Sequence, residues 1–374
     1  MIEKNQLTQA NKQLEQFLAS KHNAYTQAIF LQTAAQLAIQ REQYYSAITY
    51  LEQANALKVL PNFISRNIRY NLSQLYLQEN KLKKSLQALK GWLALSKGKI
   101  TVQQHIFAAT VFSQDKQYKS AIKHVNQAIK AQKKSRLAIP KSWYQLSISL
   151  YLQQKNYHQA IKLYQVLIKN YPPNKADWQQ LSGLYMQTQQ PRLALSVLEL
   201  ANKQQILNVE EDYLRLFNLY LYVDSPFHAA ELLQSSLLSG AIKANKENQL
   251  KLVDAWIMAQ EYDQAIKTLQ KIAQLEPKNG QYVFKIGRLL MEQGKWQAAY
   301  EKFELAQTKK LSSKGHAYLL QGISAYYAKE PKKAQQALKK ALGYKKYQKK
   351  ADSWLEQVSY ITPELSPRIF LVTR

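Results

Sequence analysis

Apolar residues recur along this chain at spacings of three and four, in a motif that returns roughly every 36 residues. The motif places a small residue three positions after an aromatic or large one and four positions before a large apolar one, as in Trp296, Ala299 and Phe303. The small residue, here named the anchor, occurs at Ala47, Ser85, Ala121, Ala160, Ala194, Ala230, Ala265, Ala299 and Ala334. Such spacings put side chains on one face of a helix, so each motif predicts a helix.

A second helical motif precedes each anchor by about sixteen residues. Trp178, Leu181 and Tyr185 show it best, because their spacings also place them on one helical face. Each repeat therefore predicts two antiparallel helices, and the small anchor allows the second helix to approach the first closely. One such pair cannot bury its apolar face alone, so stacked pairs must share a continuous core. The pattern predicts an all-α fold, a right-handed superhelical solenoid of about nine helix pairs.

The predicted solenoid spans residues 28–343, and the two ends of the sequence differ from it. The second-helix spacing also appears within residues 1–27, which predict an orphan helix, the second helix of a truncated repeat. We therefore expect upstream sequence, including any export signal, to have been removed. Residues 344–360 predict a helix that caps the last pair, and residues 361–374 predict a tail.

Some repeats depart from the pattern. Pro191 and Pro331 stand where the aromatic residue is expected. Repeats four and six are expected to carry one extra residue between their helices. The segment 236–248 predicts a longer connection between repeats.

Composition supports a helical protein and removes several kinds of chemistry. The 374 residues include ten Gly, ten Pro and no Cys. Few turn residues argue against a sandwich or a barrel, and the absence of Cys excludes disulfides, Cys-ligated metals and a Cys nucleophile. The mean hydropathy is −0.44, and no window of about 18 uncharged apolar residues predicts a membrane span.

Charge is the most unusual global property of the sequence. Fifty-two Lys and Arg against 25 Asp and Glu give a formal net charge of +27. The excess is +8, +10, 0 and +9 in residues 1–100, 101–200, 201–300 and 301–374, so no single basic tail explains it. Such a surplus attracts polyanions without defining a fold.

The sequence has no recognisable catalytic or metal-binding motif. The six His lie in separate segments, and none has another His at metal-ligand spacing on its own helix. The phosphate-binding patterns GxxxxGK and GxGxxG and the nucleophile pattern GxSxG are absent. The acidic run Glu210, Glu211 and Asp212 fits the positive end of a helix dipole. We expect no catalytic residue, cofactor or metal, and no small-molecule substrate.

The repeat resembles the tetratricopeptide repeat over residues 28–343, most closely in repeats four, five, seven and eight. In proteins with this repeat the first helices line a concave groove that binds partners. The resemblance implies the following groove residues: Tyr70, Gln74, Tyr144, Ile148, Gln179, Met186, Asn218, Tyr222, Asp254, Phe284, Arg288 and Tyr326. Lysines instead concentrate on the second helices and loops.

An amide-rich and aromatic groove predicts a protein partner, held as an extended or helical segment. The alternative is a basic electrostatic module for nucleic acid or anionic membrane lipid. Nucleic acid is disfavoured, because most of the 25 Tyr occupy repeat positions that build the core and Arg is scarce relative to Lys. Peripheral contact with an anionic membrane stays open.

A narrower resemblance comes from the order of several segments: Tyr70–Leu95, Trp143–Trp178, Lys314–Lys340 and Ala351–Val358. Together they resemble the tetratricopeptide repeat protein that accompanies TonB, ExbB and ExbD in Gram-negative bacteria. The resemblance implies a periplasmic protein that assists energy-dependent iron uptake and contacts these components. The same fold would also suit a regulator of a cell-envelope enzyme, and a cytoplasmic location is the alternative.

Overall fold

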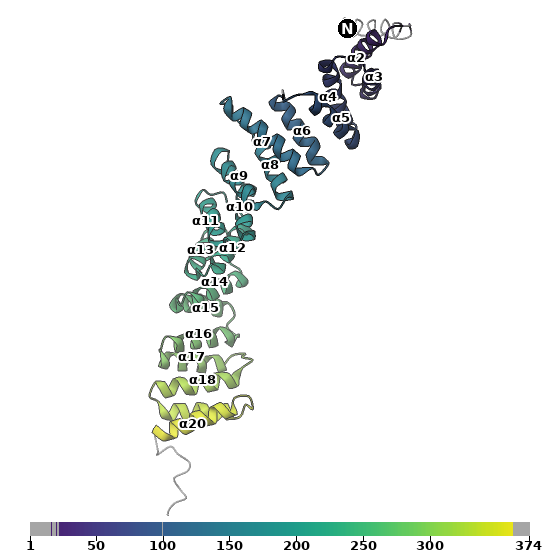
Figure 1. Ribbon diagram of the computed structural model, residues 1–374. Helices are drawn as coiled ribbons and strands as arrows, with labels where there is room; N and C mark the ends of the chain where they lie inside the picture. Colours follow the sequence, from purple (N-terminus) through teal and green to yellow (C-terminus); the bar gives the residue numbers. More distant parts are fainter. Residues whose placement is uncertain (1–15, 17–19, 21, 99, 362–374) are drawn as a thin grey trace, which may run out of the picture. The chain divides into compact units, whose positions relative to one another are not determined.

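The computed structural model describes residues 16, 20, 22–98 and 100–361 (Figure 1). The described residues form nineteen α-helices and no strand, with one isolated backbone bridge between Asn279 and Lys310. The protein divides into two compact units, Met1–Asp177 and Trp178–Arg374, and each is described by itself. The prediction of an all-α fold is confirmed.

The helices alternate between a first and a second member of nine pairs. The first helices are α2 (Ala24–Gln40), α4 (Asn62–Gln78), α6 (Val102–Gln114), α8 (Lys141–Gln153), α10 (Lys175–Gln187), α12 (Glu210–Tyr222), α14 (Lys246–Met258), α16 (Gly280–Glu292) and α18 (Lys314–Tyr327). The second helices are α3 (Tyr44–Ala56), α5 (Leu82–Leu95), α7 (Tyr118–Lys134), α9 (Tyr157–Asn170), α11 (Pro191–Lys203), α13 (Pro226–Ser239), α15 (Tyr262–Leu275), α17 (Trp296–Gln307) and α19 (Pro331–Leu342). Within each unit, helices pack chiefly on their neighbours in sequence.

The described residues include the predicted capping helix but little of the predicted orphan helix and tail. The predicted orphan helix at 1–27 lies almost entirely outside the described residues, and α2 already begins at Ala24. The final helix, α20, spans Gln348–Ile361 and packs on α19. The predicted tail, residues 361–374, lies outside the described residues beyond Ile361.

The turn inside every helix pair has the same backbone geometry. Two residues before each second helix, one residue has a φ between 55° and 69°: Glu42, Asn80, Lys116, Lys155, Gln189, Asp224, Gln260, Gly294 and Lys329. The N–H of the following residue donates to the carbonyl oxygen five residues earlier, at 2.7 to 2.9 Å, in all nine turns. This pair of features is the Schellman ending of a helix. Eight of the nine left-handed residues are not glycine, so a protein with ten Gly still forms nine tight turns.

All nine anchor residues are fully buried, as the motif predicts. Ser85 is the one anchor that is not alanine, and its hydroxyl finds hydrogen-bond partners within its own helix pair. Its hydroxyl donates to the carbonyl oxygen of Ser73 at 2.6 Å, and the Ser73 hydroxyl donates to the carbonyl oxygen of Ser85 at 3.0 Å. A polar group in the core is tolerated here because both serines have partners.

The expected extra residue in repeats four and six is wrong. In most turns the left-handed residue lies five positions before the anchor, and Lys155 and Ala160 keep that distance in repeat four. In repeat six the same distance from Asp224 leads to Ala229, which is also fully buried. Ala229 is therefore the equivalent position, and α13 begins three residues before it with Pro226. Pro191 and Pro331 likewise begin α11 and α19, where a proline loses no hydrogen bond.

The connection predicted at 236–248 is shorter than expected. Helix α13 continues to Ser239 and α14 begins at Lys246, so the connection covers only 240–245. Gly240 ends α13 with a φ of 78°, and Ile242 is 1% exposed, which makes it a buried apolar contact within the connection.

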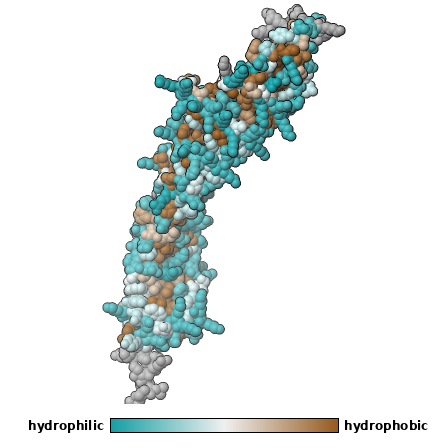
Figure 2. Space-filling model, in the orientation of Figure 1, coloured by the Kyte–Doolittle hydropathy of each residue, from teal (hydrophilic) through white to brown (hydrophobic). Residues whose placement is uncertain are grey.

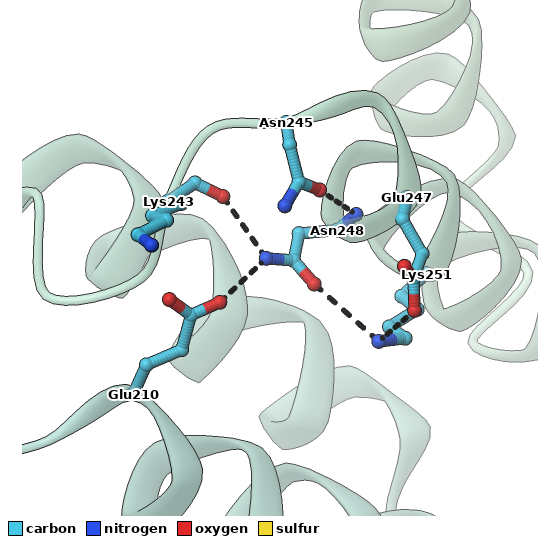
Figure 3. Close-up of polar contacts among 6 residues, drawn as sticks. All are labelled: Glu210, Lys243, Asn245, Glu247, Asn248 and Lys251. Atoms are coloured by element: carbon cyan, nitrogen blue, oxygen red, sulfur yellow. Dashed lines mark hydrogen bonds and ion pairs between the residues drawn. The ribbon is translucent and has the colours of Figure 1, made fainter.

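Polar contacts hold this connection against α12 (Figure 3). The side chain of Asn245 accepts the backbone N–H of Asn248 at 2.9 Å and so caps α14. The buried Asn248 amide donates to Glu210 at the start of α12 at 2.9 Å and to the carbonyl oxygen of Lys243 at 3.0 Å. One asparagine thus links two consecutive repeats.

Hydrophobic side chains fill the space between the helices of each unit. The largest fully buried side chains are Trp92 in the first unit and Phe303 in the second. Hydrophilic side chains cover most of the visible face, with hydrophobic patches between them (Figure 2). Among the described residues, no helix combines the length and the hydrophobicity that a membrane-spanning segment requires.

Two histidines that lie far apart in the sequence meet between α6 and α7. The Nδ1 atoms of His105 and His124 are 2.9 Å apart, so one ring donates to the other. Phe112 stacks on the ring of His124 at 5.5 Å. Burial lowers the pKa of both histidines, and it lowers that of His124 to about 4, with His105 and Lys123 contributing repulsion. Both rings are therefore neutral near pH 7.

We predict that glycine at the left-handed turn position stabilises the protein. Lys155→Gly and Gln260→Gly should each raise the free energy of unfolding by about 0.5–1 kcal/mol, because a Cβ in this conformation is costly and the greater entropy of unfolded glycine offsets only part of the gain. Urea unfolding followed by circular dichroism measures the change. Lys162→Gly, on the exposed face of α9, is the control and should lower stability by about 1 kcal/mol. A loss of similar size at Lys155 would contradict the prediction.

We also predict that the histidine pair makes the fold acid-sensitive. An unfolded His124 has its ordinary pKa of 6.5, whereas in the folded protein the pKa is about 4, so protonation favours unfolding. The contribution of the neutral histidine pair to the free energy of unfolding is complete above pH 6.5 and is lost as the pH falls toward 4. Between pH 7 and 4.5 the wild type should lose about 1–2 kcal/mol more than His124→Gln, measured by urea unfolding. Equal losses would show that His124 is not responsible.

Candidate functional site

A pocket in the second unit gathers four of the twelve predicted groove residues. It lies between α10, α11 and α12 and has a volume of about 280 Å³. Its lining residues are Gln179, Ser182, Gly183, Met186, Leu198, Arg215, Asn218, Leu219 and Tyr222. The predicted members are Gln179 and Met186, seven positions apart on α10, and Asn218 and Tyr222, four positions apart on α12. These spacings place each pair on one helical face. We name this site the α10–α12 pocket.

The side chain of Gln179 is held in place by the start of α12. Its Nε2 donates to Oδ1 of Asp212 at 2.7 Å, and the backbone N–H of Asn208 donates to Oδ2 of the same carboxylate at 3.3 Å. Asp212 is 3% exposed and lies in the first turn of α12, as the acidic run predicts. No described residue donates a hydrogen bond to the Oε1 of Gln179. The site therefore presents an oriented acceptor at low conformational cost.

The α10–α12 pocket combines amides, an apolar floor and one aromatic ring. Met186 and Leu219 supply apolar surface, and Asn218 adds a second carboxamide. Tyr222 is 67% exposed, so most of its ring is available to a partner. The volume is below the roughly 300–1,000 Å³ of pockets for drug-sized molecules. The pocket is suited to one or two side chains of a bound segment.

The predicted groove residues of the first unit do not form such a pocket together. Tyr70 is half-buried and its ring packs against Trp92 at 4.9 Å, while Tyr144 lies 6.0 Å from the ring of Tyr171. Burial raises the pKa of Tyr70 and of Tyr144. Gln74 is exposed. Ile148 is only 3% exposed, so its assignment to a binding surface is corrected: it packs between helices.

The remaining predicted residues of the second unit are also dispersed. Phe284 is 6% exposed and its ring lies 5.5 Å from Phe303, so it belongs to the core and its assignment as a partner contact is corrected. Tyr326 is half-buried, with its ring 5.3 Å from that of Trp354. Asp254 and Arg288 are exposed. These two are accessible, but neither lines the α10–α12 pocket.

Five residues of the pocket were not predicted. Ser182, Gly183 and Leu219 lie on the first helices between the selected positions, and Leu198 comes from a second helix. Arg215 is the only charged lining residue of the pocket. Its spacing of three from Asn218 places it on the same helical face, which is a signal that the sequence contains. Leu198 offers no such signal, because its contact depends on how α11 packs.

The described residues contain no group of three or more His, Asp or Glu that could hold a metal ion. The His105 and His124 pair has two nitrogen atoms and no third ligand beside them. Tyr220 donates to Glu199 at 2.7 Å, and burial together with this hydrogen bond raises the pKa of the phenol. The two residues form a structural contact between α12 and α11.

Two segments of the protein match models of the tetratricopeptide repeat, residues 141–174 and residues 250–313. The first covers the pair of α8 and α9, and the second covers most of α14 through α17. A search of curated protein sequences finds no match.

Several solved structures are similar to this protein. A tetratricopeptide repeat protein from Parabacteroides merdae shares 16% identity over 69% of this chain and 98% of its own, with a TM-score of 0.32. The Naa15/Naa10 structure bound to HypK-THB shares 14% identity over 97% of this chain and 60% of the matched chain, with a TM-score of 0.48. A crystal structure of MamA protein shares 21% identity over 47% of this chain and 94% of its own, with a TM-score of 0.35.

The sequence matches fall on helix pairs whose turn and anchor are the same as in the other pairs. The protein therefore contains tetratricopeptide repeats, at residues 141–174 and 250–313, within a series of nine helix pairs built in the same way.

Proposed function

We propose that this protein is a non-catalytic scaffold that binds a segment of a partner protein along its first helices. Tetratricopeptide repeats generally mediate interactions between proteins. The observation that carries the proposal is the α10–α12 pocket, where four residues selected as groove positions converge beside a held amide. That convergence supplies a defined contact point for the partner.

The chemistry of the pocket favours a peptide over other ligands. The carboxamides of Gln179 and Asn218 can exchange hydrogen bonds with the backbone of an extended segment. Met186 adapts its shape to an apolar side chain, and Tyr222 offers a rigid ring at low entropic cost. Arg215 adds one positive charge, which suits a carboxylate near the bound residue.

For the identity of the partner we propose a component of the TonB, ExbB and ExbD system, with the protein acting in the periplasm. Support for this comes from the ordered segments of the sequence, from Tyr70–Leu95 to Ala351–Val358, that resemble the associated repeat protein. The neutral groove also suits a protein segment better than a polyanion.

A second candidate function is attachment to an anionic surface by the second helices. Residues 116–175 contain twelve Lys and Arg and no Asp or Glu. Most of them lie on or beside α7 and α9, and Lys141 forms an ion pair with Asp177 at 2.9 Å. Exposed lysines near an anionic leaflet contribute about 1 kcal/mol each.

The scaffold proposal predicts that binding depends on the α10–α12 pocket. A peptide selected against the wild-type protein from a random library, and the purified periplasmic domains of the cognate TonB and ExbD, are the ligands. Gln179→Ala combined with Tyr222→Ala should weaken binding at least tenfold, measured by calorimetry, because both side chains meet the ligand.

The matched control is Gln180→Ala combined with Tyr360→Ala, which removes the same residue types at exposed positions away from the pocket. It should change affinity less than twofold. Equal effects of the two double variants would contradict the proposed site. Binding of the selected peptide but not of TonB or ExbD would contradict only the proposed partner.

The surface-attachment candidate predicts a steep salt dependence. Binding to vesicles that contain phosphatidylserine should weaken by an order of magnitude or more between about 50 and 200 mM salt, because several lysines release counterions together. Sedimentation of the protein with the vesicles measures it. Neutral vesicles are the control, and a response that is flat with salt would remove this candidate.

A further inference from the structure

A second pocket, in the first unit, lies around an arginine that has no hydrogen-bond partner in the part of the chain that the structure describes. Arg69 is half-buried on α4, and no described residue accepts a hydrogen bond or forms an ion pair with it. Its Nε atom is completely buried and unpaired. Buried donors are almost always satisfied in folded proteins, because leaving one unsatisfied costs free energy. The position of Arg69 therefore indicates an acceptor that the described residues do not supply.

The neighbouring helix is shaped to receive this guanidinium. Gly91 lies inside α5, where glycine is a poor helix former. A Cβ at that position would lie 2.4 Å from the Nη1 of Arg69 and 3.2 Å from its Cδ. Any other residue would therefore displace the arginine side chain. Glycine at position 91 allows the guanidinium to rest directly on α5.

The pocket beside Arg69 is formed by three consecutive helices and has a volume of about 370 Å³. Its lining residues are Glu52, Asn55 and Ala56 of α3, Arg69, Leu72 and Tyr76 of α4, and Lys84, Gln87 and Ala88 of α5. Their spacings of three and four place each set on one helical face. The two outer walls are second helices, and the α10–α12 pocket belongs to the other unit, so this is a separate site.

The charges in this pocket leave the positive charge of Arg69 without a compensating negative charge. Glu52 accepts a hydrogen bond from the hydroxyl of Tyr76 and another from Nζ of Lys84 at 3.1 Å. These donors hold the pKa of Glu52 below its usual range, so the carboxylate is ionised and is offset by Lys84. The guanidinium of Arg69 then supplies a net charge of one, with the amides of Asn55 and Gln87 as further donors.

We propose that this pocket binds a single carboxylate of a partner protein, from an acidic side chain or from the partner's C-terminus, on the guanidinium of Arg69. A carboxylate matches the planar fork of arginine and can accept two parallel hydrogen bonds. One negative charge balances the pocket, whereas a phosphate dianion would exceed the charge of Arg69 and meet stronger repulsion from Glu52. Leu72, Ala56 and Ala88 provide apolar surface for the carbon atoms that carry the carboxylate.

The direct test observes the Nε–H resonance of Arg69 by nuclear magnetic resonance in the full-length protein. The probes are the blocked peptide acetyl-Gly-Gly-Asp-Gly-amide, its Asn counterpart, and acetyl-Gly-Gly-Gly-Gly with either a free or an amidated C-terminus. We expect the Asp peptide, the free C-terminus, or both to shift this resonance in a saturable way, and the uncharged partners to leave it unchanged. The responding peptide identifies the source of the carboxylate. No shift with either carboxylate would overturn the proposal.

Variants separate a binding role from a structural one. Arg69→Gln should weaken binding of the responding peptide at least tenfold, and Arg69→Lys, which keeps the charge but loses the fork, should weaken it less. Arg66→Gln, on the same helix, is the matched control and should change affinity less than twofold. Glu52→Gln should strengthen binding severalfold, because it removes the repelling charge, an effect that a packing role of Arg69 does not explain.

Folding of each variant is checked by circular dichroism. If Arg69→Gln does not fold, Arg69→Lys takes its place in the comparison of peptide affinities. Equal affinities for the Arg69 and Arg66 variants would overturn the proposal. Inorganic phosphate provides the remaining comparison: binding of phosphate tighter than that of the carboxylate peptide would overturn the assignment of the ligand as a carboxylate.

Discussion

The left-handed residue that ends every first helix is the constraint on which the rest of the protein depends. It sets the direction in which the second helix returns, and the Schellman hydrogen bond holds that direction in all nine pairs. The anchor then lies at a constant distance from the turn, as Lys155 and Ala160 show, and always meets the first helix. Ala229 lies at this same distance from the left-handed residue Asp224. Counting apolar residues alone led to its neighbour Ala230, because that count takes no account of the turn.

A constant turn also separates the two surfaces of the protein. First helices contribute amides and rings at repeated positions, so the α10–α12 pocket forms where two consecutive first helices present them together. Second helices carry much of the lysine, and the first unit has on that side a pocket of a different character, with Arg69 seated against Gly91. The excess positive charge behind the net charge of +27 is therefore not spread evenly, because the second helices carry much of the lysine.

Much of the fold could be predicted from local spacing, whereas the site could be predicted only in part. The anchors, the helix pairs and the acidic start of α12 depend on contacts between residues close in sequence. Phe284 was misassigned because a groove position in the repeat becomes a core position when a neighbouring side chain, here Phe303, packs against it. Ile148 is likewise buried. The pairing of His105 with His124 could not be predicted from spacing on one helix, because they are nineteen positions apart and lie on two helices joined by a turn.

By itself, the sequence determined the repeat, the helical class and the positions that must be small, because these follow from the 3.6-residue period and from the space that two close helices leave. Only the tertiary structure decided which polar groups find partners. Gln179 is held by Asp212, whereas Arg69 has no acceptor among the described residues, and neither fact can be read from spacing. Side-chain pairing across helices depends on the rotation of each helix and on the size of its neighbours, and a one-dimensional pattern contains neither.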